Sequence, residues 1–512
     1  MTGTAEASEV STGGIGRRSR RSHAVAPQIN YAKRDTSIDI ILMVKQGLAT
    51  FGQVMATGEA TEWKEAIDSE AASREENGTF EDIGTLPSGK KAIPTKIILT
   101  RKLDPTGKLI RYKARLVAQG FRQTLGVDYH ETYSPVANMD SVRIALTIAA
   151  ALDLEVEQLD MVTAFLASDL EEEVYVKLPE GILGGPQIVR LWKSLYGLKQ
   201  SPRCWYITID TFILSELGFT RCRFDTCIYI RESDGIMIML YIDNMLLIGK
   251  ADAVAEVREK IAGRFDVVCL GPVKHFLGII IERDRPQRSI YISQVGYIER
   301  ILEHVGLAKC NSVTTPLIPK EKLMPQVKDK PGVQNPEPKA NEQHYQQAIG
   351  SLGWLAGATR PDIAYAASLL GRFAKDPGET HWEGVKRVFQ YIAGTKGLQL
   401  RLGGGKADLA DTFIGYVDAD FAGDSKRQST SGFIFGLGIV AITWRSKKQK
   451  ITALSTADAE FIASAAAIQE LLWFWQLLCR MLRMETLPAT VLYNYNAAAL
   501  ASFFDDEYQP HS

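Results

Sequence analysis

The chain has 512 residues, of which 46% are apolar and 23% charged, and 59 Lys and Arg residues against 60 Asp and Glu residues leave a formal net charge of −1. This composition excludes a disordered chain, and the charge balance excludes a global attraction to DNA or anionic lipid, so any polyanion site has to be local. At ~100–200 residues per domain, the length predicts about three globular units. Six widely spaced cysteines exclude a disulfide framework and indicate a reducing compartment.

Residues 1–55 are expected to form a disordered basic tail or linker. Residues 1–35 are rich in Ser, Gly and Arg and lack the apolar core of a secretory signal, and a nuclear import signal stays open as an alternative. The longest apolar stretches, 144–152 and 236–248, are shorter than the ~20 residues of a membrane-spanning helix. We therefore expect no membrane segment and an intracellular location, cytoplasmic or nuclear.

The local charge changes sign early in the chain. Residues 56–83 carry nine acidic and two basic residues around a helical apolar pattern that ends at Asn77, which predicts a solvated acidic helix. Residues 90–122 carry ten basic residues and one acid, Asp104, a local net charge of +9. The turn signal at 104–107 predicts a β-hairpin that displays this basic patch. The size and charge of the patch are those of a polyphosphate-binding site. A solvated basic hairpin that binds no ligand explains the pattern equally well.

Two aspartates lie at the ends of apolar runs, where packing gives no reason for a carboxylate. Asp160 ends one run, and Asp243 with Asn244 separates two apolar runs that read as a hairpin. Phosphoryl transfer by two metal ions, ~3.5–4 Å apart, needs a few carboxylates, with phosphates and water as the other ligands. Singly, each aspartate is more often a turn or capping residue. Two strands that each offer an aspartate meet the need for Mg²⁺ or Mn²⁺, and the further sequence blocks described below favour this interpretation over two separate turns.

The second half of the chain divides at a proline-rich segment. Residues 316–340 contain six prolines among charged and amide residues, which resists helix and central strand and predicts a linker. Residues 341–402 have a helical pattern. Three strand patterns, a long helix from Ser455 to about Met484 and a last strand at 490–495 then predict an α/β arrangement for residues 410–512.

A series of ordered sequence blocks carries a family resemblance. The blocks are RYKARLVAQGF (111–121), ETYSPV (131–136), LDMVTAFL (159–166), EEVYVKLPEG (172–181), SLYGLKQSPRCWY (194–206), YIDN (241–244), LGPVKHFLGI (270–279) and TRPDIAYA (359–366). With them the chain resembles, over residues 63–500, the reverse transcriptase and ribonuclease H portion of a copia-type LTR retrotransposon Pol polyprotein.

The resemblance implies a mixed α/β (α+β) fold, a right-hand polymerase of fingers, palm and thumb followed by a ribonuclease H-like α/β domain. The implied division of the chain is fingers and palm at 56–315, a Pro-rich linker at 316–340, a helical thumb or connection at 341–402 and a C-terminally truncated ribonuclease H-like domain at 410–512. The oligomeric state stays open.

The resemblance also implies the polymerase site residues. Asp160 and Asp243 would hold the metal ions, and Asn244 stands where the family has a second hairpin aspartate, which puts activity in doubt. Lys113 and Arg115 would grip the incoming triphosphate, where charge-assisted hydrogen bonds are strong. Further implied roles are exclusion of a ribose 2′-hydroxyl by Phe165, contact with nucleotide and template by Gln200, and a primer grip formed by Leu277, Gly278 and Ile279.

The C-terminal part matches two acids of the family's ribonuclease H. Asp418 in GYVDADFAGD and Glu460 in STADAEF would bind metal there. The position of a third acid is taken by Tyr495, and a phenol with a pKa near 10 is a poor magnesium ligand. Since the chain also stops at Ser512, before the family's fourth acid, we expect impaired RNA cleavage.

Two functions of different classes follow from the sequence. The first is an RNA-directed DNA polymerase that extends a DNA primer on an RNA template with deoxynucleotide triphosphates, by two-metal attack of the primer 3′-hydroxyl. The second is a catalytically inactive retroelement relic or a reused nucleic-acid-binding module. A third, an α/β protein unrelated to nucleic acid, requires that the patch at 90–122 binds no duplex at low salt.

Overall fold

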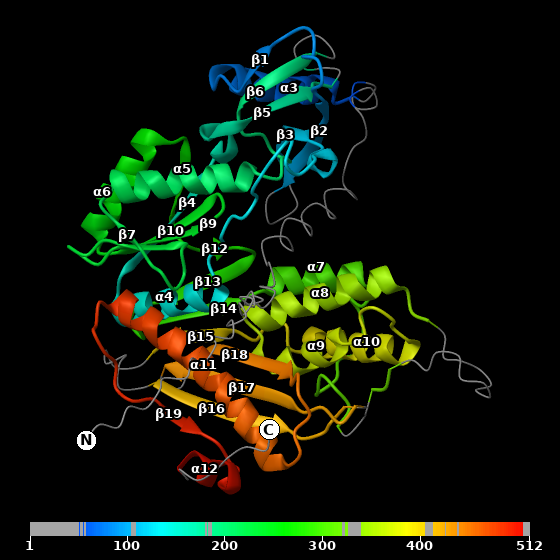
Figure 1. Ribbon diagram of the computed structural model, residues 1–512, viewed down its shortest axis with the longest axis vertical. Coiled ribbons are helices and arrows are strands. Elements are labelled where there is room, and N and C mark those ends of the chain that lie inside the picture. Colours follow the sequence, from blue (N-terminus) through cyan, green and yellow to red (C-terminus); the bar gives the residue numbers. More distant parts are fainter. Residues whose placement is uncertain are drawn as a thin grey trace, which may run out of the picture.

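The computed structural model describes residues 58–103, 109–179, 187–319, 339–404, 413–424, 426–437 and 440–504, together with 51, 55, 182 and 323–325 (Figure 1). Four expectations lie wholly or mostly outside these residues: the basic tail at 1–55, the turn at 104–107, most of the linker at 316–340, and the chain end at 505–512. The described chain is arranged as four β-sheets with helices packed against them.

The first sheet has five strands and its own apolar core. The predicted hairpin is present, with β2 and β3 antiparallel from Thr95 opposite Ala118 to Leu103 opposite Leu109. Helix α3 (Ala60–Glu76) ends at Asn77 as predicted, but it is only partly solvated because Trp63 and Ile67 are buried against the sheet. The strand order is β1 (Phe80–Asp82), β6 (Ile188–Lys193), β5 (Asp169–Lys177), β2 (Ala92–Leu103), β3 (Leu109–Ala118).

The second sheet has six strands and carries the predicted hairpin at 238–248. Its central strands β9 and β10 are buried almost throughout, which explains why their sequences are continuous apolar runs rather than alternating ones. The strand order is β11 (Val267–Pro272), β4 (Glu155–Met161), β10 (Asn244–Gly249), β9 (Met237–Tyr241), β8 (Ile228–Ile230), β7 (Thr220–Arg221). The helices of this part are α4 (Met139–Ala151), α5 (Ser201–Ser215) and α6 (Ala251–Arg264).

A third sheet connects the predicted helical segment at 341–402 to residues 275–293. Strand β15 (Leu400–Gly403) follows the helices and returns to pair with β14 (Ser289–Ser293), so this segment is not a separate unit. The other strands are β12 (His275–Phe276) and β13 (Ile279–Asp284). The helices are α7 (Val295–His304), α8 (Glu342–Ala358), α9 (Ala364–Gly371) and α10 (Glu379–Gly394).

The C-terminal part has the predicted order of three strands, a helix and a strand. Ser455 caps α11 (Thr456–Leu482) by accepting a hydrogen bond from the backbone N–H of Asp458. By length and composition alone α11 could cross a membrane, a property that the sequence reading missed; in the fold it packs on β16 and β17 with nine residues buried. The other elements are β16 (Phe413–Asp420), β17 (Thr430–Leu437), β18 (Val440–Lys448), β19 (Val491–Tyr493) and α12 (Ala497–Phe504).

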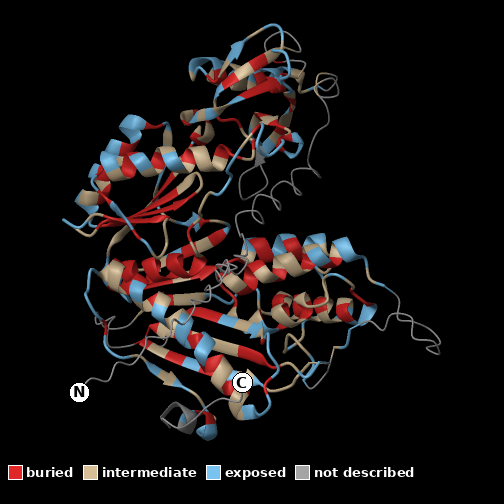
Figure 2. Ribbon diagram, in the orientation of Figure 1, coloured by how far each residue is buried: buried red, intermediate tan, exposed pale blue. Residues whose placement is uncertain are grey.

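Helix α4 joins the six-stranded sheet, the third sheet and the C-terminal part. All thirteen of its residues are buried (Figure 2), and a single apolar cluster runs from the six-stranded sheet through the helices α7–α10 to the C-terminal sheet. Arg143 on α4 is 2% exposed and donates to the backbone carbonyls of Gly357, Ala358 and Ile442 at 2.5–2.9 Å. Its guanidinium also lies 4.1 Å from the ring centroid of Trp444.

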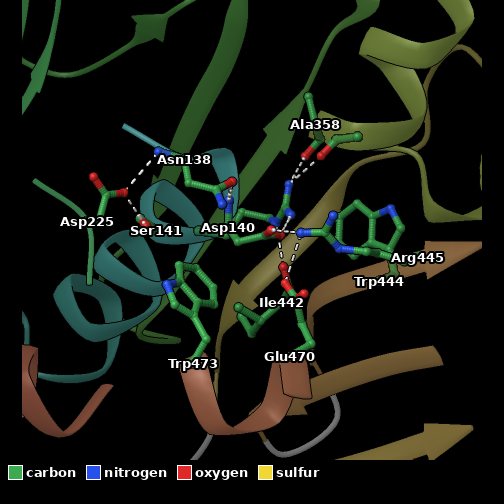
Figure 3. A network of polar contacts seen from close by, with 12 residues as sticks. Asn138, Asp140, Ser141, Asp225, Ala358, Ile442, Trp444, Arg445, Glu470 and Trp473 are labelled. Carbon is green, nitrogen blue, oxygen red and sulfur yellow. Dashed lines mark hydrogen bonds and ion pairs between the residues drawn. The ribbon is translucent and has the colours of Figure 1, made fainter. Parts of the chain in front are cut away.

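A network of polar contacts extends from Asp225 and Ser141 through Asp140 to Arg445 and Glu470 (Figure 3). Asp140 forms an ion pair with Arg143, and Arg445 on β18 forms one with Glu470 on α11 at 2.9 Å. Trp473 on α11 donates from Nε1 to the carbonyl of Phe224 at 3.0 Å. The C-terminal part therefore packs directly against α4 and the loop at Phe224, through hydrogen bonds as well as apolar contacts.

Candidate active site

The centre of the site is the turn between β9 and β10. Tyr241 pairs with Asn244, so Ile242 and Asp243 form a two-residue turn. Ile242 has a φ of +57°, which is unfavourable for a β-branched residue and marks stored strain. Two hydrogen bonds hold the turn: Trp205 on α5 donates from Nε1 to the Ile242 carbonyl at 2.6 Å, and the Asp243 carbonyl accepts from the N–H of the residue after Asp160 at 2.9 Å.

Asp160 lies beside this turn. In the antiparallel pair of β4 and β10, Asp160 is directly opposite Asn244, which immediately follows Asp243. Directly opposed residues have Cβ atoms ~4.5–5.5 Å apart. The fold therefore brings together the two aspartates that the sequence singled out, although they come from different strands and lie far apart in the chain.

Asn244 uses both ends of its amide within the protein. Its Nδ2 donates to Asp243 Oδ1 at 3.1 Å, and its Oδ1 accepts from Gln158 Nε2 at 3.2 Å. Burial raises the pKa of Asp243, and the hydrogen bond from Asn244 together with the charges of Arg115 and Lys113 offsets part of this rise. The carboxylate is thus a desolvated anion that a bound cation would stabilise.

The charges of the basic hairpin act on the same carboxylate. Lys113 and Arg115 are two residues apart on β3, so they project from the same face of the strand, opposite the core-facing Ala114. Both charges act on Asp243. The guanidinium of Arg115 also lies 5.1 Å from the ring centroid of Tyr196.

Phe165 lies against the same tyrosine. The ring centroids of Phe165 and Tyr196 are 4.8 Å apart with an edge-to-face orientation. Tyr196 lies within SLYGLKQSPRCWY just before Gly197, but no sequence pattern marks it as a site residue. Gly197 has a φ of +89°, and a Cβ there would lie 2.2 Å from the carbonyl oxygen of Ala118, so only glycine permits this close approach to β3.

Gln200 is placed differently from the sequence expectation of direct contact with nucleotide. It is 1% exposed, its Nε2 donates to the carbonyl of Asp128 at 2.9 Å, and its Oε1 accepts from Gln123 at 2.9 Å. Its amide is therefore engaged inside the protein, between α5 and the loop after β3. A sequence motif does not distinguish a buried amide from a ligand-facing one.

The segment expected to be the primer grip forms a second tight hairpin. Phe276 pairs with Ile279, and Leu277 and Gly278 form the turn with φ angles of +53° and +76°. Gly278 is exposed and Ile279 is 2% exposed, so the turn is anchored by its apolar end and presents its backbone outward.

The two C-terminal acids also lie together. Glu460 on α11 is 8% exposed; burial raises its pKa, and both the charge and a hydrogen bond of Asp418 on β16 raise it further. The nearest neighbour after β19 is Asn494, whose Nδ2 lies 3.4 Å from Glu460 Oε2 and 3.0 Å from Ser464 Oγ. Tyr495, which the sequence assigned to the third acid's position, is 85% exposed.

The donor sets decide how well each site suits a divalent cation. Among the residues that the structure describes, no three His, Cys, Asp or Glu side chains are grouped as metal ligands. The first site offers the carboxylates of Asp160 and Asp243, and the second those of Asp418 and Glu460. Mg²⁺ is often held by one or two carboxylates with substrate phosphates and water, so both pairs suit one cation better than two.

Comparisons with known proteins agree with this arrangement. A family model described as reverse transcriptase (RNA-dependent DNA polymerase) matches residues 77–319. The retrovirus-related Pol polyprotein from transposon TNT 1-94 of Nicotiana tabacum is 41% identical over 433 residues, 82% of this chain and 32% of that protein. The putative transposon Ty5-1 protein YCL074W of Saccharomyces cerevisiae is 31% identical over 321 residues, 61% of this chain and 100% of that protein.

Among solved structures, a foamy viral protease-reverse transcriptase in complex with double-stranded DNA matches with a TM-score of 0.42 and 11% identity, over 80% of this chain and 61% of that one. That similarity is too low to carry an argument. The chain spans 28–32% of the length of the first Pol polyproteins that it matches. The predicted α/β fold class is confirmed, and the chain belongs to the reverse transcriptase family of copia-type retrotransposon Pol polyproteins.

Proposed function

We propose that this chain is an RNA-directed DNA polymerase that extends a DNA primer on an RNA template. The observation that carries the proposal is the pairing of Asp160 with Asn244 beside Asp243, with the charges of Lys113 and Arg115 acting on the same carboxylate. Two carboxylates next to two cations suit a triphosphate that carries a metal ion. The proposal assigns fingers and palm to 56–315, a linker to 316–340, a thumb or connection to 341–402 and a ribonuclease H-like domain to 410–512.

The metal ligands in this proposal are Asp160 and Asp243. Mg²⁺ or Mn²⁺ bound there would lower the pKa of the primer 3′-hydroxyl and neutralise charge on the phosphates. Asp243 favours this role because desolvation of its half-buried carboxylate raises its pKa despite the hydrogen bond from Asn244 and the charges of Arg115 and Lys113. Asn244 contributes no charge, and its hydrogen bond fixes the orientation of Asp243.

The remaining residues bind and orient the substrates. Lys113 and Arg115 hold the triphosphate by charge-assisted hydrogen bonds and stabilise the pyrophosphate as it leaves. Phe165, held against Tyr196, fills the space next to the sugar and favours deoxynucleotides. The turn at Leu277, Gly278 and Ile279 supports the primer backbone, and the buried Gln200 positions the loop between fingers and palm rather than contacting nucleotide.

The ribonuclease H-like domain is proposed to be impaired. Asp418 and Glu460 supply two carboxylates, but the side chain next to Glu460 is the neutral amide of Asn494. A site with two carboxylates binds two divalent ions less tightly than one with three or four. RNA cleavage should therefore be weaker than DNA synthesis.

One observation favours a second candidate function, a relic or reused module that binds nucleic acid without catalysis. The amide of Asn244 occupies a position next to both aspartates and donates a hydrogen bond to Asp243, which competes with metal binding. The basic hairpin does not depend on this position and would still bind a duplex.

Primer extension on an RNA template with Mg²⁺ and deoxynucleotides tests the polymerase. The parent should extend the primer, Asp160→Ala should abolish extension, and Asp169→Ala, which changes an exposed aspartate on β5, should leave it unchanged. Extension that survives Asp160→Ala contradicts the proposed metal site. A parent that binds the duplex at low salt without extending the primer supports the second candidate.

A further inference from the structure

Helix α3 lies against the strand that carries the proposed triphosphate-binding residues, although it precedes the matched family region of 77–319. Trp63 meets Tyr112 of β3 edge-on with ring centroids 4.6 Å apart. Glu70 Oε1 accepts a hydrogen bond from the backbone N–H of Leu116 at 2.8 Å. Because Leu116 directly follows Arg115, this bond fixes α3 at the position of that arginine.

Arg74, one helical turn after Glu70, is an unusual buried cation. It is 1% exposed and forms an ion pair with Glu70. Its Nε and Nη1 are buried, and neither donates a hydrogen bond to any acceptor in the described part of the chain. Burying guanidinium donors in this way costs free energy, so the arginine has to be explained by an interaction of its charge. The ring of Tyr196 lies 5.9 Å from its Cζ.

Tyr196 connects Arg74 to the nucleotide site. Arg115 lies 5.1 Å from the same ring, and Phe165 meets the ring edge-to-face at 4.8 Å. Burial raises the pKa of Tyr196, and the charges of Arg115 and Arg74 oppose this rise while Asp243 and Glu70 add to it. The ring of Tyr196 therefore interacts with the buried Glu70–Arg74 ion pair and with Arg115, which is proposed to bind triphosphate. It also interacts electrostatically with Asp243, which is proposed to bind metal.

We propose that the Glu70–Arg74 ion pair of α3 is a positioning element for the incoming deoxynucleotide triphosphate and acts through Tyr196 on Arg115 and Phe165. This inference rests on the proposed polymerase function. Arg115 is a long side chain with several rotamers, and a ring held by a second guanidinium and by Phe165 restricts them. Preorganised cations bind phosphate with a smaller loss of conformational entropy.

Nucleotide binding without chemistry provides the test. The full chain is bound to an RNA template and a DNA primer that ends in a dideoxynucleotide, and the dissociation constant of the next deoxynucleotide is measured with Mg²⁺. Arg74→Met should raise it about tenfold, and Arg74→Lys, which keeps the charge and loses the planar group, about threefold. The dissociation constant of the primer–template should change less than about twofold in both, since α3 acts on Arg115 rather than on the duplex.

Two further variants make the result decisive. Lys64→Met changes an exposed cation on the same helix and should leave nucleotide binding unchanged. Glu70→Gln keeps an oxygen for the Leu116 N–H and removes only the charge, and it should raise the dissociation constant about threefold even if Arg74→Met does not fold. Nucleotide affinity equal to the parent's in Arg74→Lys and Glu70→Gln overturns the positioning role alone. A parent that binds the duplex and no nucleotide overturns the polymerase proposal and this inference with it.

Discussion

Asp160 and Asn244 are directly opposed in the antiparallel pair of β4 and β10, with Asn244 hydrogen-bonded to Asp243. The side chain at position 244 therefore adjoins both carboxylates. Its charge determines how much negative potential is available to a divalent cation, and through that cation to the transition state.

The variant Asn244→Asp should extend an RNA-templated primer at least about tenfold faster than the parent, equivalent to ~1.4 kcal/mol of transition-state stabilisation. The added carboxylate replaces an amide that donates to Asp243, so the Mg²⁺ concentration for half-maximal rate should fall as well. Steady-state extension over a Mg²⁺ series measures both quantities. The double variant Asp160→Ala with Asn244→Asp should be inactive. An Asn244→Asp chain no faster than the parent would show that this position does not limit metal binding.

Asp243→Asn should stabilise the protein in the absence of divalent cations at neutral pH. Burial raises the pKa of Asp243 above its unfolded value, so the folded protein disfavours the ionised form, and the parent loses stability as pH rises through that raised pKa. The gain in melting temperature should thus be present at pH 7.5 and vanish below the unfolded pKa of ~3.9.

Thermal unfolding in EDTA and in Mg²⁺ checks this sign. Mg²⁺ should raise the melting temperature of the parent more than that of Asp243→Asn, because the variant keeps only the Asp418–Glu460 pair and a ligand stabilises only a form that binds it. Asp169→Asn is the matched control, since Asp169 is exposed on β5. A lower melting temperature for Asp243→Asn in EDTA would mean that this carboxylate is compensated by the protein.

Gly197→Ala should destabilise the protein by about 3 kcal/mol or more. The left-handed backbone at φ +89° costs an L residue about 1–2 kcal/mol, and the new Cβ would lie 2.2 Å from the carbonyl oxygen of Ala118. Gly218→Ala is the control, because Gly218 has a φ of +70° with no atom near its Cβ position and should lose only the backbone part. Urea unfolding compares the two variants. If both variants lose the same free energy of unfolding, the close approach of Gly197 to β3 does not restrict this position to glycine.

Arg143→Met should cost about 3–5 kcal/mol, since it removes the ion pair with Asp140, whose other cation Arg445 is 3.9 Å away, and three buried or partly buried hydrogen bonds to backbone carbonyls. Urea unfolding should also separate into two transitions, because Arg143 links α4 to the C-terminal part. Arg445→Met removes a half-exposed ion pair with Glu470 and should cost at most about 1 kcal/mol. A single transition at unchanged midpoint in Arg143→Met would contradict this role.

Asn494→Asp should increase cleavage of the RNA strand in an RNA/DNA hybrid. The amide at 494 lies 3.4 Å from Glu460, so an aspartate there adds a third carboxylate to the pair of Asp418 and Glu460. Tyr495→Asp is the control because Tyr495 is 85% exposed. Hybrid cleavage in Mg²⁺ measures the change, and cleavage restored by Tyr495→Asp alone would reverse this assignment.

Local sequence signals predicted the elements that position the site. The hairpins at 92–118 and 237–249, the helix capped by Ser455 and the succession of three strands, a helix and a strand in the C-terminal part follow from periodicity, turn residues and capping chemistry, which are local properties of the chain. The apolar runs singled out Asp160 and Asp243, because packing gives no reason for a carboxylate at the end of an apolar strand, and the family resemblance then implied their role as metal ligands.

Which side chains meet depends on how the helices and sheets pack. Tyr196 lies next to the site because Gly197 permits a close approach to β3. The amide of Gln200 is hydrogen-bonded inside the protein, and Asn494 rather than Tyr495 lies next to Glu460. The contacts of Arg74 and Arg143 link segments that are distant in the chain and depend on how helices dock on sheets. Local sequence determines whether a segment forms a strand or a helix. The partner of a buried charge depends instead on the packing of the whole chain, because a buried charge without a partner costs free energy.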